Sequence, residues 1–412
     1  MSAGGARLTA MSILAALLER LPNRTHGPGS AEYDAGRTVF AGVGEPAAVV
    51  RPTTAAEVAE AVRAARGALA IEGGGTRGVG HAVEGERLST AGLSGITLYE
   101  PGALTLVAAA GTPVAEIEAL LAAEGQALAF EPMDHRAALG TTGAPTIGGA
   151  VATNASGPRR VLAGACRDHL LGVRFVDGRG QVLKSGGRVM KNVTGLDLGK
   201  LLCGARGTLG ILTEVALKVL PAAKVSITLA YSDRSEAAAV ALFCAALRTP
   251  YEIAGAAWRD GVAYLRIEGS AVQAEHRLTQ LRARFGAAEM LEGGASAELW
   301  RDLRDVKHFA GTGPLWRIGV RPTDAAGVAA ALRERTGARV SLDWGGALLW
   351  AAGDGLTAAA VQGAVGPVGG RATAVRGAEP AAPAADRRTA LIAGLRARFD
   401  PAGILNPGLV VD

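Results

Sequence analysis

Three consecutive glycines at residues 73–75 have the composition of an anion-binding loop. They follow the hydrophobic run Ala68–Glu72 directly, and Thr76 and Arg77 come next. Without side chains, neighbouring backbone N–H groups can converge on one point and bind anionic oxygens such as those of a pyrophosphate. Thr76 can add a hydroxyl donor, whereas Arg77 can add charge or simply face solvent. The triplet alone fits a phosphate loop and a plain turn equally well.

Two common nucleotide-binding motifs are excluded. Gly73, Gly75 and Gly78 match the spacing G-x-G-x-x-G. A dinucleotide site of that kind needs a helix that opens at the loop, and the following residues AVEGERL form no long apolar helix. The chain also contains no G-x-x-x-x-G-K-[ST] segment, so a P-loop is not expected.

Charge and cysteine content exclude further classes. The formal net charge is +5, from 43 basic and 38 acidic residues, with no Lys/Arg block of the kind that binds nucleic acid. The three cysteines, Cys166, Cys203 and Cys244, match neither a zinc pattern nor a disulfide framework. We expect reduced thiols in a cytoplasmic protein and no metal site, because iron–sulfur clusters generally need four cysteine ligands.

The sequence predicts no transmembrane span. No apolar run approaches the roughly 20 residues that a bilayer crossing requires. The segment 8–21 resembles the core of a signal peptide, but Glu19 and Arg20 interrupt it and no small-x-small cleavage site follows. It is therefore interpreted as an amphipathic N-terminal helix.

The elements that position the glycine loop alternate between short β-rich runs and helical runs. Thr53 and Thr54 are expected to cap a helix that ends at Gly67, and Pro113 is expected to open a second helix that ends at Gly125. Asp177-Gly178 marks a hairpin. The predicted strands of this half are 48–51, 68–72, 95–99, 105–109, 171–176 and 181–185.

The second half predicts a compact antiparallel sheet with helices on one face. Its expected strands lie near 225–231, 256–266, 315–320, 340–344 and 347–351, and its helices at 235–248, 274–285 and 325–335. Residues 380–386 are expected to be a linker before a helix at 387–398. We predict an N-terminal extension over 1–35, one domain over 36–221, an α+β cap over 222–386, and a C-terminal helix and tail over 387–412 that returns to the first domain.

Four segments of the first half occur together in one known family. They are AVVRPTTAAEVAEAVRAAR (48–66), IEGGGTRGVG (71–80), PTIGGAVATNASG (145–157) and GARGTLGILTEVALKVLP (204–221). In order and spacing they resemble the FAD-binding domain of the vanillyl-alcohol-oxidase and p-cresol-methylhydroxylase (PCMH) family. The resemblance implies an α+β protein in which two subdomains hold an extended FAD and an antiparallel cap domain follows.

The resemblance also implies which residues contact FAD. The glycine loop would hold the pyrophosphate, the segment near 148 would lie along the ribityl chain and flavin ring, and the segment near 210 would meet the adenine. These residues are Gly73, Gly74, Gly75, Thr76, Thr146, Ile147, Gly148, Gly149, Asn154, Gly207, Gly210 and Ile211. Their chemistry agrees, because glycine lets the backbone approach a flat ring and Thr or Asn can hydrogen-bond to hydroxyl and carbonyl groups.

Noncovalent FAD is expected. Many relatives attach the flavin through a histidine in or near the pyrophosphate loop, and here Thr76 occupies that place. His81 is the nearest imidazole, and it lies beyond the loop.

The second half narrows the resemblance. ELWRDLRDVKHF (298–309), GPLWRIGV (313–320), SLDWGGALLWAA (341–352) and FDPAGILNPG (399–408) resemble the smaller FAD-binding subunit of bacterial glycolate oxidases. That family implies a complex with a larger flavin subunit and an iron–sulfur subunit, which oxidises glycolate to glyoxylate. We therefore expect a cytoplasmic hetero-oligomer that reaches the inner membrane, if at all, through its partners.

Three departures from the family pattern bear on catalysis. Leu196 stands where relatives usually have Tyr, and Arg206 replaces an acidic residue before the third segment. The histidine-rich HPGDGN-type segment of the larger flavin subunit has no counterpart. His135, His169 and His308 are isolated, so each is interpreted as a surface or core residue.

Oxidation of a 2-hydroxy acid requires a cation for the carboxylate, a base for the hydroxyl proton and a flavin to accept the hydride. Arg304, Arg317 and Lys307 are candidates for the cation, with surface ion pairs as the alternative, and His308 is a candidate base. No catalytic residue is fixed by these observations. The missing histidine segment also favours a subunit that relays electrons or supports a catalytic partner.

Three functions remain open from the sequence. The first is an FAD-dependent oxidoreductase of CH–OH groups that works as a subunit of a glycolate oxidase. The second is a stand-alone FAD enzyme for another small 2-hydroxy acid. The third is a non-catalytic assembly subunit, which the intact glycine triplet and TIGG segment disfavour.

Overall fold

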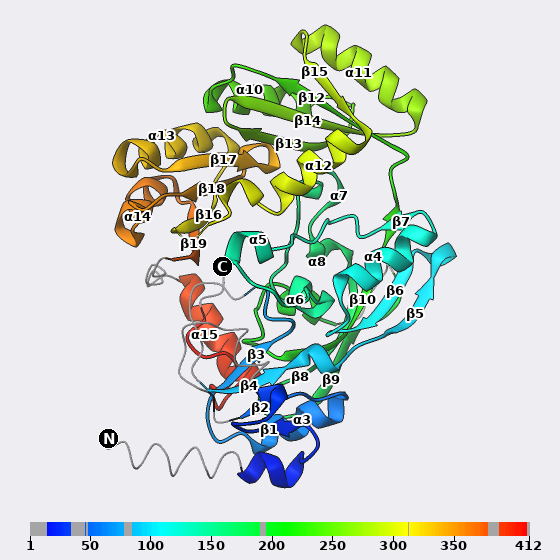
Figure 1. Cartoon of the computed structure of the whole chain (residues 1–412), viewed down its shortest axis with the longest axis vertical. Coiled ribbons are helices and arrows are strands. Elements are labelled where there is room, and N and C mark those ends of the chain that lie inside the picture. The colour runs from blue at the N-terminus through cyan, green and yellow to red at the C-terminus, as the bar shows by residue number, and fades with distance from the viewer. Residues whose placement is uncertain are drawn as a thin grey trace.

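The computed structural model describes residues 15–33, 46, 48–77, 85–189, 195–311, 313–377 and 387–409. Two small sheets and a two-stranded pair form the N-terminal half, and one large sheet lies above them in Figure 1. The expected α+β class, with a two-part FAD-domain fold followed by an antiparallel-sheet domain, is confirmed.

The first small sheet carries the glycine loop at the end of one strand. Its strand order is β1 (Thr25–His26), β2 (Val49–Val50), β4 (Glu86–Ser89) and β3 (Leu69–Glu72), and the last three strands are parallel. Helix α3 (Ala55–Ala64) begins at the predicted cap, where the side chain of Thr54 accepts a hydrogen bond from the N–H of Glu57. Because β3 runs straight into residue 73, the sheet fixes where the loop starts.

The second small sheet is antiparallel and supports the other two predicted FAD segments. Its order is β5 (Ile96–Glu100), β6 (Thr105–Ala109), β10 (Ile211–Lys218), β8 (Leu170–Val176) and β9 (Val182–Gly186), which confirms the predicted hairpin. The helices of this region are α4 (Val114–Ala123), α5 (Arg136–Leu139), α6 (Ile147–Ala152), α7 (Arg160–Ala163), α8 (Cys166–His169) and α9 (Leu198–Leu202). The short strands β7 (Gln126–Ala127) and β11 (Leu220–Pro221) pair beside them.

The large sheet has eight antiparallel strands in the order β15-β12-β14-β13-β17-β18-β16-β19. The first βαββαβ unit is β12 (Val225–Tyr231), α10 (Glu236–Leu247), β13 (Ile253–Arg259), β14 (Val262–Gly269), α11 (Ala271–Phe285) and β15 (Glu289–Glu292). The second is β16 (Leu315–Gly319), α13 (Ala325–Thr336), β17 (Arg339–Asp343), β18 (Leu348–Ala352), α14 (Ala358–Val365) and β19 (Arg371–Arg376). The two units join where β13 pairs with β17.

The faces of the large sheet are covered differently. The four helices of the two units pack on one face around the largest apolar core, as predicted. Helix α12 (Gly293–Arg304) packs on the opposite face, where Trp300 contacts Ala230 and Tyr264. The rest of that face, which includes Trp350 of β18 and Val375 of β19, contacts Met133 and Ala138 of the N-terminal half. The prediction of helices on one face was therefore incomplete.

The C-terminal segment returns to the first small sheet. Helix α15 (Arg387–Phe399) runs alongside the N-terminal half in Figure 1, and Leu405 then forms a parallel bridge with Leu69 of β3. No helix in the described ranges has both the length and the apolarity that a bilayer crossing demands.

Candidate functional site

The predicted FAD residues gather around a cavity of about 130 Å³, which we call the glycine-loop cavity. Of the twelve predicted residues, ten line it: Gly73, Gly74, Gly75, Thr76, Thr146, Gly148, Gly149, Gly207, Gly210 and Ile211. Ile147 is fully buried in the apolar core behind them, and Asn154 lines a second, larger cavity.

The glycine loop presents backbone donors without partners. The N–H groups of Gly74, Gly75 and Thr76 donate a hydrogen bond to no other described residue. Gly75 has a φ of +67°, a left-handed conformation that favours glycine. Successive N–H groups turned by such a residue form a concave anion site. The loop therefore has both the donors and the conformation that a phosphate needs.

Gly74 is also required for the close approach of two loops. A Cβ atom at Gly74 would lie 1.7 Å from the carbonyl oxygen of Ala144, which no backbone contact allows. A side chain at this position would separate the glycine loop from the segment before α6 and disturb the cavity wall.

Helix α6 begins at the cavity. The hydroxyl of Thr146 accepts the N–H of Gly149 at 3.2 Å, and the N–H of Gly148 donates to the carbonyl of Ala110 at 2.7 Å. A Cβ atom at Gly148 would lie 2.6 Å from that same carbonyl. Thr146 therefore caps the helix in this structure, and Gly148 is needed for its contact with the sheet.

Asn154 has a structural role in the wall of the larger cavity. Its side-chain oxygen accepts the N–H of Arg167 at 3.1 Å and lies 3.6 Å from the Sγ of Cys203. Its backbone has a φ of +48°, a conformation that asparagine tolerates better than most residues.

The third predicted segment is held by a residue from the far end of the chain. The side-chain amide of Asn406 donates to the carbonyl of Arg206 at 2.8 Å and accepts the N–H of Ile71 at 2.7 Å. One side chain thus ties the loop before β10 to the strand that leads into the glycine loop. Asn406 lies in the segment FDPAGILNPG, where no local pattern predicts this contact.

Glu72 places a carboxyl group beside the loop. Burial raises its pKa to about 8, and the positive charges of Arg87 and Arg51 oppose this only in part. Its Oε2 is buried and has no hydrogen-bond partner within the described part of the chain. The side chain is therefore largely neutral at pH 7 and does not repel an anion in the cavity.

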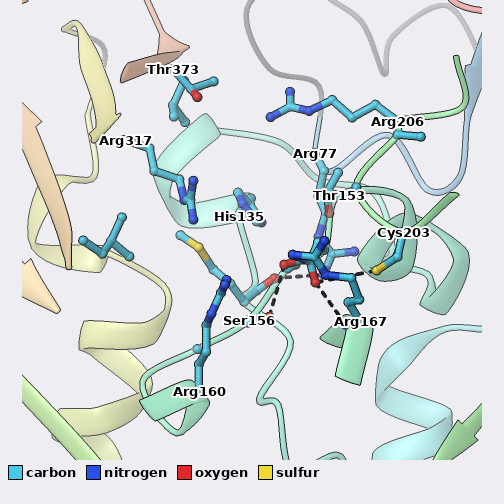
Figure 2. Close-up of a pocket in the computed structure, with 18 of the residues that line it drawn as sticks. Arg77, His135, Thr153, Ser156, Arg160, Arg167, Cys203, Arg206, Arg317 and Thr373 are labelled. Carbon is cyan, nitrogen blue, oxygen red and sulfur yellow. Dashed lines mark hydrogen bonds between the residues drawn. The ribbon is translucent and has the colours of Figure 1, made fainter. Parts of the chain in front are cut away.

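A second cavity of about 350 Å³ is lined by residues of both the N-terminal half and the large sheet, and we call it the seam cavity. It shares Arg77, Thr153 and Arg206 with the glycine-loop cavity, so the two are adjacent. Among the described residues that line it, one is acidic, Asp343, and eight are basic: Arg77, Arg160, Arg167, Lys200, Arg206, Arg304, Arg317 and Arg388. Figure 2 shows several of these side chains extending into one space.

Arg77 lies between the two cavities and lines both of them. Its side chain therefore adds charge to the site instead of simply facing solvent. Its guanidinium donates to the carbonyl of Thr146 at 3.2 Å and to that of Met133 at 2.8 Å. Burial lowers its pKa to about 10, while Asp134 opposes the shift. The group remains charged at neutral pH.

The predicted catalytic candidates separate in space. Arg304 and Arg317 line the seam cavity, where Arg304 pairs with Asp305 at 2.7 Å. His308 and Lys307 are among the lining residues of neither cavity. His308 shares a 2.8 Å hydrogen bond with Ser341, and its pKa falls to about 4 through burial and the charge of Arg259. Lys307 pairs with Asp302 near the surface.

His135 is the imidazole that lines the seam cavity. Burial, followed by the charge of Arg77, lowers its pKa to about 3, and Arg317 and Arg206 act in the same direction. The interpretation of His135 as an ordinary isolated histidine overlooked this position. Nothing in the local segment MDHR marks it, because the neighbours that define its environment come from distant parts of the chain.

Metal ligands and thiols add little to this site. The described residues contain no group of three or more His, Cys, Asp or Glu side chains that could hold a metal ion. All three cysteines are free, with Cys166 and Cys203 buried near the seam cavity and Cys244 partly buried elsewhere. His81 lies outside the described residues.

Comparison with known proteins agrees with this geometry. Residues 46–186 match the model of the FAD binding domain family. The chain is 33% identical over 348 residues to glycolate oxidase subunit GlcE of Escherichia coli (strain K12), which covers 82% of this chain and 91% of that protein. It is also 46% identical over 84 residues to a D-lactate dehydrogenase of Anaerostipes hadrus, covering 20% of this chain and 18% of that protein.

The solved structures extend the likeness of the fold to nearly the whole chain. A 4-ethylphenol oxidase from Gulosibacter chungangensis superimposes with a TM-score of 0.72 at 13% identity, covering 97% of this chain and 96% of that one. An alkyldihydroxyacetonephosphate synthase gives a TM-score of 0.67 at 16% identity, covering 89% of this chain and 78% of the other. With its FAD-binding domain and its match to nearly all of the E. coli protein, the chain belongs to the family of glycolate oxidase subunit GlcE.

Proposed function

We propose that this chain is the FAD-carrying subunit of a glycolate oxidase, an FAD-dependent oxidoreductase that converts glycolate to glyoxylate. Its relation to GlcE supports the substrate and the complex. The observation that carries the cofactor is the set of N–H groups at Gly74, Gly75 and Thr76, which line a cavity and have no partner among the described residues. Bound FAD would accept a hydride, and with it two electrons, from the carbon that bears the hydroxyl group.

The residues of the glycine-loop cavity fit FAD. The N–H groups of residues 74–76 would hold the pyrophosphate, helped by a neutral Glu72 that adds no repulsion. The loop at Gly207 and Gly210 would lie at the adenosine end. The flavin end would point toward the seam cavity, where Arg77 and Arg206 border both spaces. In this arrangement the residues of the chain bind and orient the cofactor.

Noncovalent attachment is part of the proposal. Thr76 is nearly fully buried at the place where relatives have a histidine, and its hydroxyl cannot form the usual bond to the flavin ring. The FAD should therefore leave the protein when the protein is denatured.

The partners proposed are a larger flavin subunit and an iron–sulfur subunit, to which electrons pass after oxidation of the substrate. Its similarity over 76 residues to glycolate oxidase subunit GlcD of Bacillus subtilis links this chain to a second glycolate oxidase protein. A stand-alone oxidase of another small 2-hydroxy acid is the second candidate, and a basic cavity within this chain is compatible with it, since a carboxylate substrate would find cations there.

FAD uptake tests the proposal directly. The purified full-length chain should be yellow, hold one FAD, and release it on acid precipitation. Ala152 lines the glycine-loop cavity at the end of α6, so Ala152→Trp should fill the cavity and weaken FAD binding at least about tenfold in a fluorescence titration. Ala297→Trp on the exposed face of α12 is the matched control.

The choice of position matters for this test. A substitution at Gly74 would collide with the carbonyl of Ala144, so it would not separate loss of binding from disturbance of the loops. A colourless wild-type chain that takes up no added FAD would refute the proposal, as would undiminished FAD binding by a folded Ala152→Trp protein.

A further inference from the structure

The seam cavity is more basic than the cofactor alone requires. The glycine-loop cavity, which would hold the pyrophosphate, is lined by Arg77, Arg87 and Arg206. Arg160, Arg304 and Arg317 line only the seam cavity, together with side chains of the large sheet. Arg304 is paired with Asp305 at 2.7 Å, so Arg160 and Arg317 are the two placed to act on something other than the phosphates.

The one acidic side chain among the described lining residues does not offset this charge. Asp343 is buried, and burial raises its pKa to about 8. Its carboxyl accepts the backbone N–H of Trp344, which opposes the shift, while the charge of Glu131 adds to it. Because Asp343 is largely neutral at pH 7, the cavity keeps a positive potential that favours an anionic ligand.

Arg317 is held in a defined orientation. Its guanidinium lies 5.1 Å from the centre of the Trp344 ring, and that of Arg160 lies 4.3 Å from the same ring. Trp344 is itself fixed by a 3.1 Å hydrogen bond from Nε1 to the carbonyl of Gly157. A guanidinium that lies over a ring can direct the N–H groups at its edge toward a carboxylate in a paired contact.

His135 lies next to this cation. Figure 2 shows the imidazole between Arg317 and Arg77, and the charges of both act on its pKa. The ring is half-buried and lies near the charges of Arg77, Arg317 and Arg206, and with a pKa of about 3 it is neutral at physiological pH. A neutral imidazole has one nitrogen with a lone pair, which can accept a hydrogen bond from a hydroxyl group.

The remaining wall limits the size of the ligand. Leu348 and Trp350 of β18 and Val375 of β19 are almost fully buried beside the cavity, and Met133 closes it from the N-terminal half. These apolar side chains can pack against a short hydrocarbon part of a ligand.

We infer that this chain itself binds a small 2-hydroxy monocarboxylate in the seam cavity, with Arg317 against the carboxylate and His135 accepting a hydrogen bond from the 2-hydroxyl group. The inference rests on the proposed function, because the ligand would lie beside the flavin end of the FAD site. It gives the subunit a substrate site of its own in addition to any role as an electron relay.

Binding of two inert acids tests the site without catalysis. 2-Hydroxyisobutyrate has no hydrogen on the carbon that bears its hydroxyl group, so it cannot be oxidised there, and isobutyrate lacks the hydroxyl group. Both are titrated by calorimetry into the FAD-loaded full-length chain. The hydroxy acid should bind about tenfold more tightly, since one hydrogen bond to a well-placed acceptor accounts for roughly that ratio.

Two variants separate the two contacts. Arg317→Met keeps the stem of the side chain and should weaken both acids at least about tenfold, because the carboxylate loses its paired cation. His135→Phe keeps the ring volume and should weaken only the hydroxy acid, so that the two affinities become nearly equal. Arg321→Met, at a position 73% exposed in its side chain and paired with Asp324, should change neither affinity.

The possible results show separately whether the substrate site fails and whether FAD binding fails. FAD content and melting temperature are measured first for every protein, to show that it folds and binds FAD. If one of the two variants does not fold, the other still tests its own contact. A yellow wild-type chain that binds neither acid, or variants that keep both affinities, would overturn the substrate site and leave the FAD proposal standing. A wild-type chain that takes up no FAD would instead refute the proposed function.

Discussion

Glu72 shows how burial beside the glycine loop links stability to pH. Its pKa is about 8 in the folded protein against an ordinary value of 4.5. Between these values the folded chain keeps a proton that the unfolded chain has lost, so stability falls as pH rises through this window. Asp343, whose pKa is also about 8, acts in the same direction.

Glu72→Gln should remove the contribution of Glu72. The variant should match the wild-type free energy of unfolding near pH 4 and exceed it by about 1–3 kcal/mol at pH 8. At pH 8 the wild type must either bury a charged carboxylate or keep the carboxyl protonated at a pH where the same group in water would be ionised. Urea denaturation at several pH values measures the difference. Glu116→Gln on the exposed face of α4 is the control. Parallel pH profiles for wild type and Glu72→Gln would show that this carboxyl does not control the dependence.

At the scale of elements, the C-terminal segment completes the FAD domain. Asn406 bonds to both Ile71 and Arg206, and the adjacent Leu405 pairs with Leu69. Asn406→Asp keeps the shape and the acceptor but replaces the two N–H donors with an oxygen that faces two carbonyls.

The Asn406→Asp protein should lose about 1–3 kcal/mol of stability, the cost of leaving buried acceptors unpaired. FAD should bind more weakly as well, since the loops at 71–76 and 206–211 share this anchor. Urea denaturation and a fluorescence titration measure the two effects. Pro407→Ala, next in the chain, is the control for a general effect of the tail. If FAD affinity is unchanged while stability falls, the anchor serves folding alone.

Local sequence signals predicted those elements whose ends are set by nearby residues. The cap at Thr54, the hairpin at Asp177-Gly178 and the alternation in the large sheet are all encoded within a few positions. Strand β4 was missed because its residues ERLS carry two charges that only the fold buries. The two βαββαβ units were missed as well, because their likeness lies in topology and not in repeated residues.

The residues of the candidate site also fall into those that a local sequence pattern predicts and those that depend on distant parts of the chain. Glycines that a phosphate loop needs are visible as a local pattern, and ten predicted residues do line one cavity. His135 acquires its character from Arg77, Arg206 and Arg317, which are far from it in sequence. The change from an ordinary histidine to a neutral imidazole in a basic cavity therefore cannot be deduced from spacing.

At the scale of the whole molecule, a buried set of charges joins the two halves. Arg266 of β14 pairs with Glu131 of the N-terminal half at 2.7 Å and with its strand neighbour Glu268 at 2.7 Å. Arg159, just before α7, pairs with Glu268 at 3.0 Å. All four side chains are at most 17% exposed, so each charge depends on the others for solvation.

Removing one member of this set should uncouple the halves. Arg266→Met leaves Glu131 and Glu268 buried with a single cation, and the free energy of unfolding should fall by about 3–5 kcal/mol. Because the seam cavity lies at the same boundary, the calorimetric melting of the FAD-loaded protein should broaden or split into two transitions. Arg333→Met, which breaks a surface pair with Glu236 on the far side of the large sheet, should cost about 1 kcal/mol or less and leave one transition. A single sharp transition in the Arg266→Met protein, at the temperature of the control, would mean that packing around Trp344 and Met133 joins the halves without help from these charges.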